Sequence, residues 1–472
     1  MDNANYRSQS KSIEQLFFVF YLLCFPLGYF FVYVSGAAAS LFGVLIVLGS
    51  YFLIVVKNRI YPVVFLIVYA RCINGFVVPG DLMVFKVLNV LTGYFPLLLS
   101  VLLNFRIRRS ELRYLLFKRY WITCAYTLLL LVYLLPNVAA GVQLFIPRVA
   151  PMLMLIAALV FLKDRLEWPE ITAFFRLLFM SCVVVYLTGD YLDKSYELLA
   201  SGTVFSKPLT DQSLVMLGVP RMLGTFWDFR IQGIFAVVFA LIVLMRPSYR
   251  LKKFDVCLAG VIIILSMSRG AIVLAGFVGF GYMLYNSKSV SKIVLRTLGG
   301  GMFLVLLGGV FFVAAGEYAE NIVASFDIFG DKNALSQRGG FREYALDAFV
   351  QNPLGGGIGA MKADGIDRQI LVGEVFYDKV SDAFLFIQLA EVGIVGFVLF
   401  IASLFELVHR RNMLTLCLLG GLLVQMTGTD IPDMGVYYFL LLFLLVSLLD
   451  RYSPSTETAQ QTRSAGCAGQ LG

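Results

Sequence analysis

Residues 383–408 of this chain, AFLFIQLAEVGIVGFVLFIASLFELV, contain just two charged side chains, Glu391 and Glu406. A helix needs about 20 mainly apolar residues to cross the hydrocarbon core of a bilayer, and this stretch meets that requirement. Comparable stretches recur along the whole chain. Hydrophobic residues make up 59% of it and charged residues 14%, against about 25% charged residues in soluble domains. The sequence therefore predicts an all-α polytopic integral membrane protein.

Apolar runs of this kind predict about 14 transmembrane helices, or between about 12 and 14 because two runs are short. The runs are 16–34, 37–56, 60–78, 82–103, 120–140, 144–162, 171–189, 230–245, 254–267, 270–286, 297–315, 383–408, 413–428 and 435–449. The first lacks a cleavage site of small residues, so we expect an anchor and not a removed signal peptide. We expect one transmembrane domain over 1–452 and a disordered cytoplasmic tail over 453–472.

Basic residues indicate the orientation of these helices, because Lys and Arg are retained on the cytoplasmic side. One set of connections is rich in them, most of all 104–119, whereas the short connections that alternate with this set hold none. We therefore expect both termini in the cytoplasm and two long external segments, 190–229 and 316–382. The formal net charge of +8 then reflects the internal loops, and a nucleic-acid partner is not implied.

The available side chains exclude several classes of enzyme. His409, the single histidine, is predicted at a cytoplasmic helix end, so we expect no Ser-His-Asp triad. Without other histidines or external cysteines, we expect no zinc site either. The external segments contain no cysteine, so no disulfide framework is available there. The run Gly355-Gly356-Gly357-Ile358-Gly359 lacks the following Lys-Ser or Lys-Thr of a phosphate-binding loop and predicts a turn. We expect no metal and no cofactor.

Four cationic side chains are predicted inside the membrane, near its outer face. A charge at mid-membrane costs about 2.5–3.5 kcal/mol on insertion scales, so each needs a partner or a function. One interpretation is ion pairing with Asp81, Asp190 or Asp430, or snorkelling to headgroups. The other is a site for a phosphate or diphosphate group, which guanidinium binds bidentately. The four residues are Arg71, Lys86, Arg148 and Arg269.

The external segment 316–382 adds more charged residues. Residues 336–340, SQRGG, predict a turn that carries Arg338, and the following FREYALDAFV, 341–350, predicts a short amphipathic helix. We expect this helix to lie against the membrane surface and to present Arg338 and Arg342 over the bundle, ending before Asn352-Pro353. Asp382 begins the next span, where an acidic residue can be either a helix cap or a functional group.

Three blocks in the C-terminal part of the chain together resemble the superfamily of O-antigen ligases and Wzy-type polysaccharide polymerases. The first is Ser268-Arg269-Gly270-Ala271. The second is SQRGGFREYALDAFVQNPLGGGIG at 336–359, and the third is SDAFLFIQLAEVGIVG at 381–396. Their order and placement between apolar runs match the family pattern of an arginine, an amphipathic helix, Asn-Pro-Leu, a glycine-rich turn and a following span.

The resemblance implies a membrane glycosyltransferase of the bacterial inner membrane whose active face is periplasmic. Such an enzyme would polymerise undecaprenyl-diphosphate-linked oligosaccharide repeats into O-antigen, capsule or exopolysaccharide, without metal. Membrane lipids, a chain-length regulator and a flippase are the other partners that it implies. Catalytic roles would fall to Arg338, Asp382 and Arg269. Diphosphate binding would fall to Arg342, Arg71, Lys86 and Arg148.

The sequence departs from the family in two places. Ligases usually carry a histidine followed by Asn where this chain has Asp382 and Ala383, and the family's aromatic residue four positions after its arginine is replaced by Arg342. The acidic residue is more similar to the polymerases, which favours polymerisation. Transfer of glycan to a lipid A core or another acceptor is the alternative. A transporter of lipid-linked sugars is a second alternative, which predicts charges near the midplane of the membrane.

Overall fold

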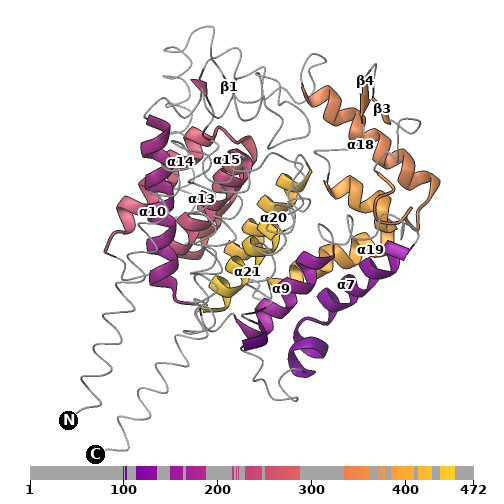
Figure 1. Ribbon diagram of the computed structural model, residues 1–472, viewed down its shortest axis with the longest axis horizontal. Coiled ribbons are helices and arrows are strands. Elements are labelled where there is room, and N and C mark those ends of the chain that lie inside the picture. The colour runs from indigo at the N-terminus through magenta and orange to yellow at the C-terminus, as the bar shows by residue number, and fades with distance from the viewer. Residues whose placement is uncertain are drawn as a thin grey trace, which may run out of the picture. The chain divides into compact units, whose positions relative to one another are not determined.

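The computed structural model describes about half of the chain, and all that follows concerns that part (Figure 1). The described residues are 99, 101–103, 113–135, 149–162, 166–187, 215–216, 219–220, 222, 229–246, 250–286, 334–361, 370–372, 375–377, 384–408, 413–427 and 436–451. The predicted spans 16–34, 37–56, 60–78 and 297–315, nearly all of 82–103, and the tail lie outside these ranges.

Every other predicted apolar run contains a helix. The helices are α7 (Trp121–Leu134), α9 (Ala150–Phe161), α10 (Trp168–Leu187), α13 (Phe229–Leu244), α14 (Lys252–Ser266), α15 (Arg269–Asn286), α19 (Phe384–Leu407), α20 (Met413–Met426) and α21 (Val436–Arg451). Two further helical elements are a π-helix, η1 (Leu115–Arg119), and α18 (Ala334–Gln351). Within the described ranges, α19 has the length and composition to cross a membrane; α7, α9, α20 and most of α13 and α15 are shorter apolar helices. The number of spans stays a prediction.

The two long segments that are predicted to be external each contain a small antiparallel hairpin. In the first, β1 (Val215–Met216) pairs with β2 (Val219–Pro220). In the second, β3 (Ile370–Val372) pairs with β4 (Val375–Tyr377). These strands are too short to build a sheet core, so the described fold is helical in its packing.

The chain divides into two compact units, residues 1–105 with 164–268, and residues 106–163 with 269–472. In the first unit α10, α13 and α14 pack together. Phe175 lies at the centre of an aromatic cluster with Phe179, Phe235 and Phe239, at centroid distances of 5.9, 6.2 and 6.1 Å. Asp255, fully buried, accepts two hydrogen bonds from Arg176, at 2.6 and 2.9 Å, so its buried charge is paired as burial requires.

In the second unit α15 and α20 form a close antiparallel pair, as the contacts along the two helices show. Gly270 lies against Gln425 at one end, and Gly281 lies against Leu414 and Cys417 toward the other. A Cβ atom on Gly281 would be 2.8 Å from the Cβ of Cys417 and 3.0 Å from the Cα of Leu414. Small residues of this kind let helix backbones approach closely where helices pack in lipid.

The other helix pair of this unit is α7 with α19, and it is joined by a carboxylate. Glu406, in the last turn of α19, accepts hydrogen bonds from the backbone N–H groups of Ile122 and Thr123, at 3.0 and 2.7 Å. These donors belong to the first turn of α7, which has no intrahelical acceptors for them. The negative charge also suits the positive end of the helix dipole. On the same unit α21 packs on α9, and Asp450 forms an ion pair with Arg119 of η1.

The α15–α20 contact generates a prediction with an internal control on the same helix. Gly276 and Gly281 both lie within α15, yet a Cβ on Gly276 would meet nothing within 4 Å. We expect Gly281→Ala to lose about 1–3 kcal/mol of stability through overpacking. Gly276→Ala should be neutral or gain up to about 1 kcal/mol of helix propensity. Thermal unfolding of the purified variants in detergent measures both, and a Gly281→Ala protein that melts at or above the Gly276→Ala protein contradicts the packing argument.

Candidate functional site

The sequence predicts one span over residues 383–408, whereas the structure shows two helical segments there, separated at Gly393. Gly393 has φ 64° and ψ −173°, outside the helical region, and it divides α19 after Val392. The rings of Phe384 and Phe400 are 5.7 Å apart between centroids, whereas about 24 Å would separate their Cα atoms in a straight helix. Tyr126 of α7 contacts both segments, through the Phe400 ring and a 2.8 Å hydrogen bond to Gln388. The expectation of one continuous helix is therefore wrong, because the chain turns sharply at Gly393.

The glycine-rich segment after α18 fills this break and satisfies the backbone groups that the break exposes. The N–H groups of Gly356 and Gly357 donate to the carbonyls of Ala390 and Glu391, at 3.0 and 2.9 Å. In return the N–H of Ile394 donates to the carbonyl of Pro353 at 3.0 Å. Backbone groups in an apolar environment cost several kcal/mol each when unsatisfied, so a broken helix persists only where such partners exist.

Glycine is required on both sides of this contact. Gly355 has φ +96° and Gly393 has φ +64°, conformations that other residues rarely adopt. A Cβ atom on Gly355 would lie 2.5 Å from the backbone nitrogen of Gly393, and one on Gly393 would lie 2.3 Å from the carbonyl carbon of Leu354. The two backbones touch directly, which explains the glycines at 355 and 393.

Side chains of α19 and the end of α7 hold the same segment in place. Glu391 is 1% exposed, and its Oε1 accepts a 3.0 Å hydrogen bond from the N–H of Gly359. The N–H of Ile358 donates to the carbonyl of Tyr133 at 2.9 Å, and the Tyr133 hydroxyl donates to the carbonyl of Leu354. The sequence predicts only a turn here. The signals that could have indicated more are a glycine and a carboxylate, Gly393 and Glu391, inside one apolar run.

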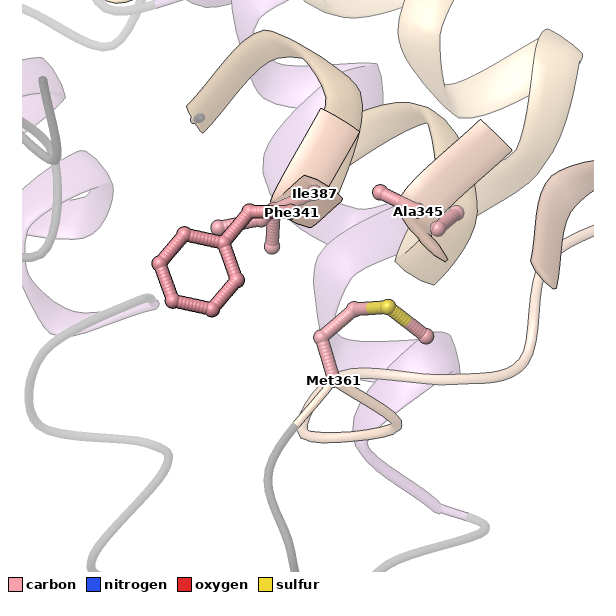
Figure 2. Close-up of a cluster of buried hydrophobic side chains, with 5 residues drawn as sticks. Phe341, Ala345, Met361 and Ile387 are labelled. Atoms are coloured by element: carbon pink, nitrogen blue, oxygen red, sulfur yellow. The ribbon is translucent and has the colours of Figure 1, made fainter. Parts of the chain in front are cut away.

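The helix α18 is longer than predicted and packs on protein. Residues 336–340 form part of its N-terminal half and not a turn, although each interior glycine costs about 1 kcal/mol of helix propensity. The predicted apolar face exists: Phe341 and Ala345 are 4% and 0% exposed, and they form a cluster with Met361, Ile387 and Ala390 (Figure 2). This face therefore lies on the first segment of α19 and on Met361, not on the membrane surface, because those residues supply the apolar partner.

Arg342 of α18 is held at the C-terminal end of α20. Its Nη2 donates to the backbone carbonyl of Thr427 at 3.1 Å, and its guanidinium lies 5.8 Å from the ring centroid of Phe386. A cation is favourable at this position because carbonyl groups at a helix C-terminus carry partial negative charge. Position 338 precedes Arg342 by four residues on the same helix. The predicted arginines Arg338 and Arg342 are thus one helical turn apart.

The turn that carries Arg269 reaches the same end of α20. Met267 ends α14 in the left-handed conformation, at φ 47°, and Arg269 begins α15 directly afterwards. A Cβ atom on Gly270 would be 3.0 Å from the side-chain nitrogen of Gln425, which precedes Thr427 by two residues. Arg269 is half-buried. The structure therefore brings the Arg269 turn and Arg342 to one end of α20.

The remaining predicted site residues lie outside the described part of the chain. They are Arg71, Lys86, Arg148 and Asp382, together with the alternative ion-pair partners Asp81, Asp190 and Asp430. The described residue nearest to Asp382 in sequence is Phe384, the first residue of α19. The geometry of this carboxylate relative to the arginines stays a prediction.

A comparison with protein families finds a match over the segment that contains these site residues. Residues 255–401 match the family model described as O-Antigen ligase. This match supports the resemblance of the chain to the O-antigen ligase/polymerase superfamily. The matched segment contains Arg269, Arg338, Arg342 and Asp382, and also the helix break with its glycine-rich partner. No curated protein matches the chain.

Members of this superfamily are membrane enzymes with glycosyltransferase-like chemistry. They act on lipid-linked oligosaccharides in lipopolysaccharide and polysaccharide biosynthesis. The matched segment ends at residue 401, within the second segment of α19. The helix break therefore belongs to the family domain of this chain, and so does the whole of α18.

The hydrogen bond between Glu391 and Gly359 can be tested by substitution. Glu391→Leu removes the acceptor of a buried N–H group, which we expect to cost about 1–3 kcal/mol of stability. Glu391→Gln keeps an oxygen acceptor at the same position, so most of the stability should remain. Thermal unfolding of both purified variants measures the difference. Equal losses in the two variants would show that the negative charge is needed, and not the acceptor.

Proposed function

We propose that this protein is a polysaccharide polymerase of the bacterial inner membrane. It transfers a glycan from an undecaprenyl-diphosphate carrier to a sugar hydroxyl of a second carrier-linked repeat unit. The product is a lengthened surface glycan such as O-antigen, capsule or exopolysaccharide, formed on the outer face of the membrane.

The observation that carries this proposal is that Arg342 and the turn that carries Arg269 meet at the C-terminal end of α20. Arg342 binds the Thr427 carbonyl there, position 338 lies one turn away on α18, and the Arg269 turn packs at Gln425. A diphosphate leaving group is doubly anionic or more, and guanidinium groups bind its oxygens bidentately. The break in α19 supports this arrangement because its contacts hold the C-terminal end of α18 in place.

The proposed reaction is a direct displacement at the anomeric carbon. The acceptor hydroxyl oxygen forms a bond to that carbon as the bond to the diphosphate oxygen breaks. The hydroxyl proton passes to the carboxylate of Asp382, acting as general base. The diphosphate leaves with the bonding electron pair, and its charge is stabilised by Arg338 and Arg269, with Arg342 assisting. The positive charge comes from these arginines, so the proposed step needs no metal ion.

The contacts of the described helices support the topology on which this proposal depends. Arg342 and Thr427, both predicted on the external side by the pattern of basic residues, form a hydrogen bond with each other. Near the predicted cytoplasmic ends, Arg119 meets Asp450, and Thr123 meets Glu406. These contacts agree with the relative directions predicted for the helices, and the side of the membrane on which each end lies stays a prediction. Arg71, Lys86 and Arg148 are proposed as further diphosphate ligands on the outer side.

The choice of a polymerase over a ligase rests on Asp382. Ligases of this superfamily usually have a histidine at the matching position, and this chain has a carboxylate followed by Ala383. Both enzymes would share the arginine site for the lipid-linked donor, and they would differ in the acceptor. Ligation to a lipid A core or another acceptor is the second candidate function. A chain-length regulator and a flippase are proposed partners for either.

A deletion strain separates the two candidate functions. Loss of a polymerase should leave single repeat units attached to their acceptor, because ligation continues. Loss of a ligase should leave no attached glycan while lipid-linked polymer accumulates. Electrophoresis of the surface glycan and of extracted lipid-linked glycan gives both readouts. Long attached chains that persist after deletion would contradict both functions.

Substitution of the proposed catalytic residues tests the site itself. We expect Arg338→Ala and Asp382→Ala each to abolish elongation. One preorganised charge-stabilising group contributes about 3–4 kcal/mol, or about 100- to 1,000-fold in rate, and a positioned general base contributes about 100- to 10,000-fold. Glu343→Ala and Asp347→Ala are matched controls, because both side chains are exposed on α18. Glycan length and membrane abundance are measured together. Near-normal chain length in the Arg338 and Asp382 variants would overturn the assignment.

A further inference from the structure

A band of exposed basic and aromatic side chains surrounds the start of α7. Tyr114, Phe117 and Trp121 are 58%, 75% and 54% exposed, which is unusual for large aromatic residues. Arg113 and Lys118 are also exposed. Residues 113, 117 and 121 are spaced by four, as are 114 and 118, so all five lie on one side of this helical stretch. We call this set the basic-aromatic face.

The opposite side of the same stretch points into the protein. Tyr120 is 1% exposed, and Arg119 forms an ion pair with Asp450 and lies over the Tyr120 ring, 5.3 Å from its centroid. Both sides belong to the same π-helical turn, which is closed by a 2.9 Å hydrogen bond from the Tyr120 N–H to the Leu115 carbonyl. Among the described residues no carboxylate forms an ion pair with Arg113 or Lys118. Both side chains of the basic-aromatic face that carry charge are exposed.

The basic-aromatic face continues along α7 as an aliphatic one. Leu128, Val132 and Leu135 are 64%, 58% and 65% exposed, and their spacing from Trp121 by seven, eleven and fourteen residues keeps them on its side of the helix. Exposed aliphatic side chains suit the acyl chains of a bilayer. Tryptophan and tyrosine are enriched at the boundary between acyl chains and headgroups. Arg113 and Lys118 then lie at the level of the headgroup phosphates.

We propose that the basic-aromatic face, residues 113–121, binds the headgroup of an anionic phospholipid. The phosphate would bind Arg113 and Lys118, and the acyl chains would lie along Phe117, Trp121 and the aliphatic face of α7. Charge complementarity selects an anionic lipid over a zwitterionic one, because juxtamembrane Lys and Arg residues are attracted to anionic leaflets. The basic-residue pattern assigns this surface to the cytoplasmic leaflet. The proposal is independent of the glycosyl-transfer site.

Fluorescence of Trp121 tests this directly in the full-length protein. The chain has three tryptophans, so the signal of Trp121 is the difference between the wild type and Trp121→Phe. The protein in detergent is titrated with phosphatidylglycerol or phosphatidylcholine, each with brominated acyl chains that quench a nearby indole. We expect half-quenching at a phosphatidylglycerol concentration lower than that of phosphatidylcholine by on the order of tenfold.

Charge variants give the control. Arg113→Gln with Lys118→Gln should abolish the preference for phosphatidylglycerol while leaving quenching by phosphatidylcholine unchanged, which shows that the segment is still folded in its place. Arg113→Lys with Lys118→Arg keeps both charges and should keep the preference. Equal quenching by the two lipids in the wild type, or a preference that survives in the neutral variant, would overturn the proposal. Displacement of phosphatidylglycerol by millimolar inorganic phosphate at constant ionic strength would also overturn it, in favour of a site for free phosphate.

Discussion

The backbone contact between Gly393 and the glycine-rich segment is the constraint on which the described site depends. A helix that breaks in apolar surroundings exposes carbonyl and N–H groups that water cannot reach, and each needs a partner. Here the partners are the amides of Gly356 and Gly357 and the carbonyl of Pro353. The contact is possible only because neither Gly355 nor Gly393 has a Cβ atom. The break and the segment that fills it are therefore a single structural feature.

This feature determines where α18 lies and hence where its arginines lie. The chain passes from α18 through Asn352-Pro353 directly into the contact, so the C-terminal end of α18 is held at the break. Phe341 and Ala345 then meet Ile387 on the first segment of α19. With α18 held by these contacts, Arg342 reaches the C-terminal end of α20.

Charge is distributed differently at the two ends of the second unit. At the end predicted to be external, Arg342 binds a carbonyl at the C-terminus of α20, where the local dipole is negative. At the end predicted to be cytoplasmic, half-buried carboxylates are the partners, with Glu406 at the first turn of α7 and Asp450 beside Arg119. A cationic external end suits a substrate that carries a diphosphate, and the basic-aromatic face suits an anionic lipid on the other side. Both fit an enzyme that works on lipid-linked anions.

The sequence by itself predicted the helical class, a helix in each described apolar run and the resemblance to the family. The length of an apolar run can be read from the sequence without knowing what packs against it, so the described runs were correctly predicted to be helical. The blocks around Arg269, Arg338 and Asp382 lie within the segment that matches the family. Only the tertiary structure decided that α19 breaks at Gly393 and that residues 336–340 are helical. It also decided that Arg342 lies at Thr427. The reason is physical: local propensity favours a helix through 393 and a turn at Gly339-Gly340. Contacts between residues far apart in sequence override both preferences, because they satisfy backbone groups and bury apolar surface.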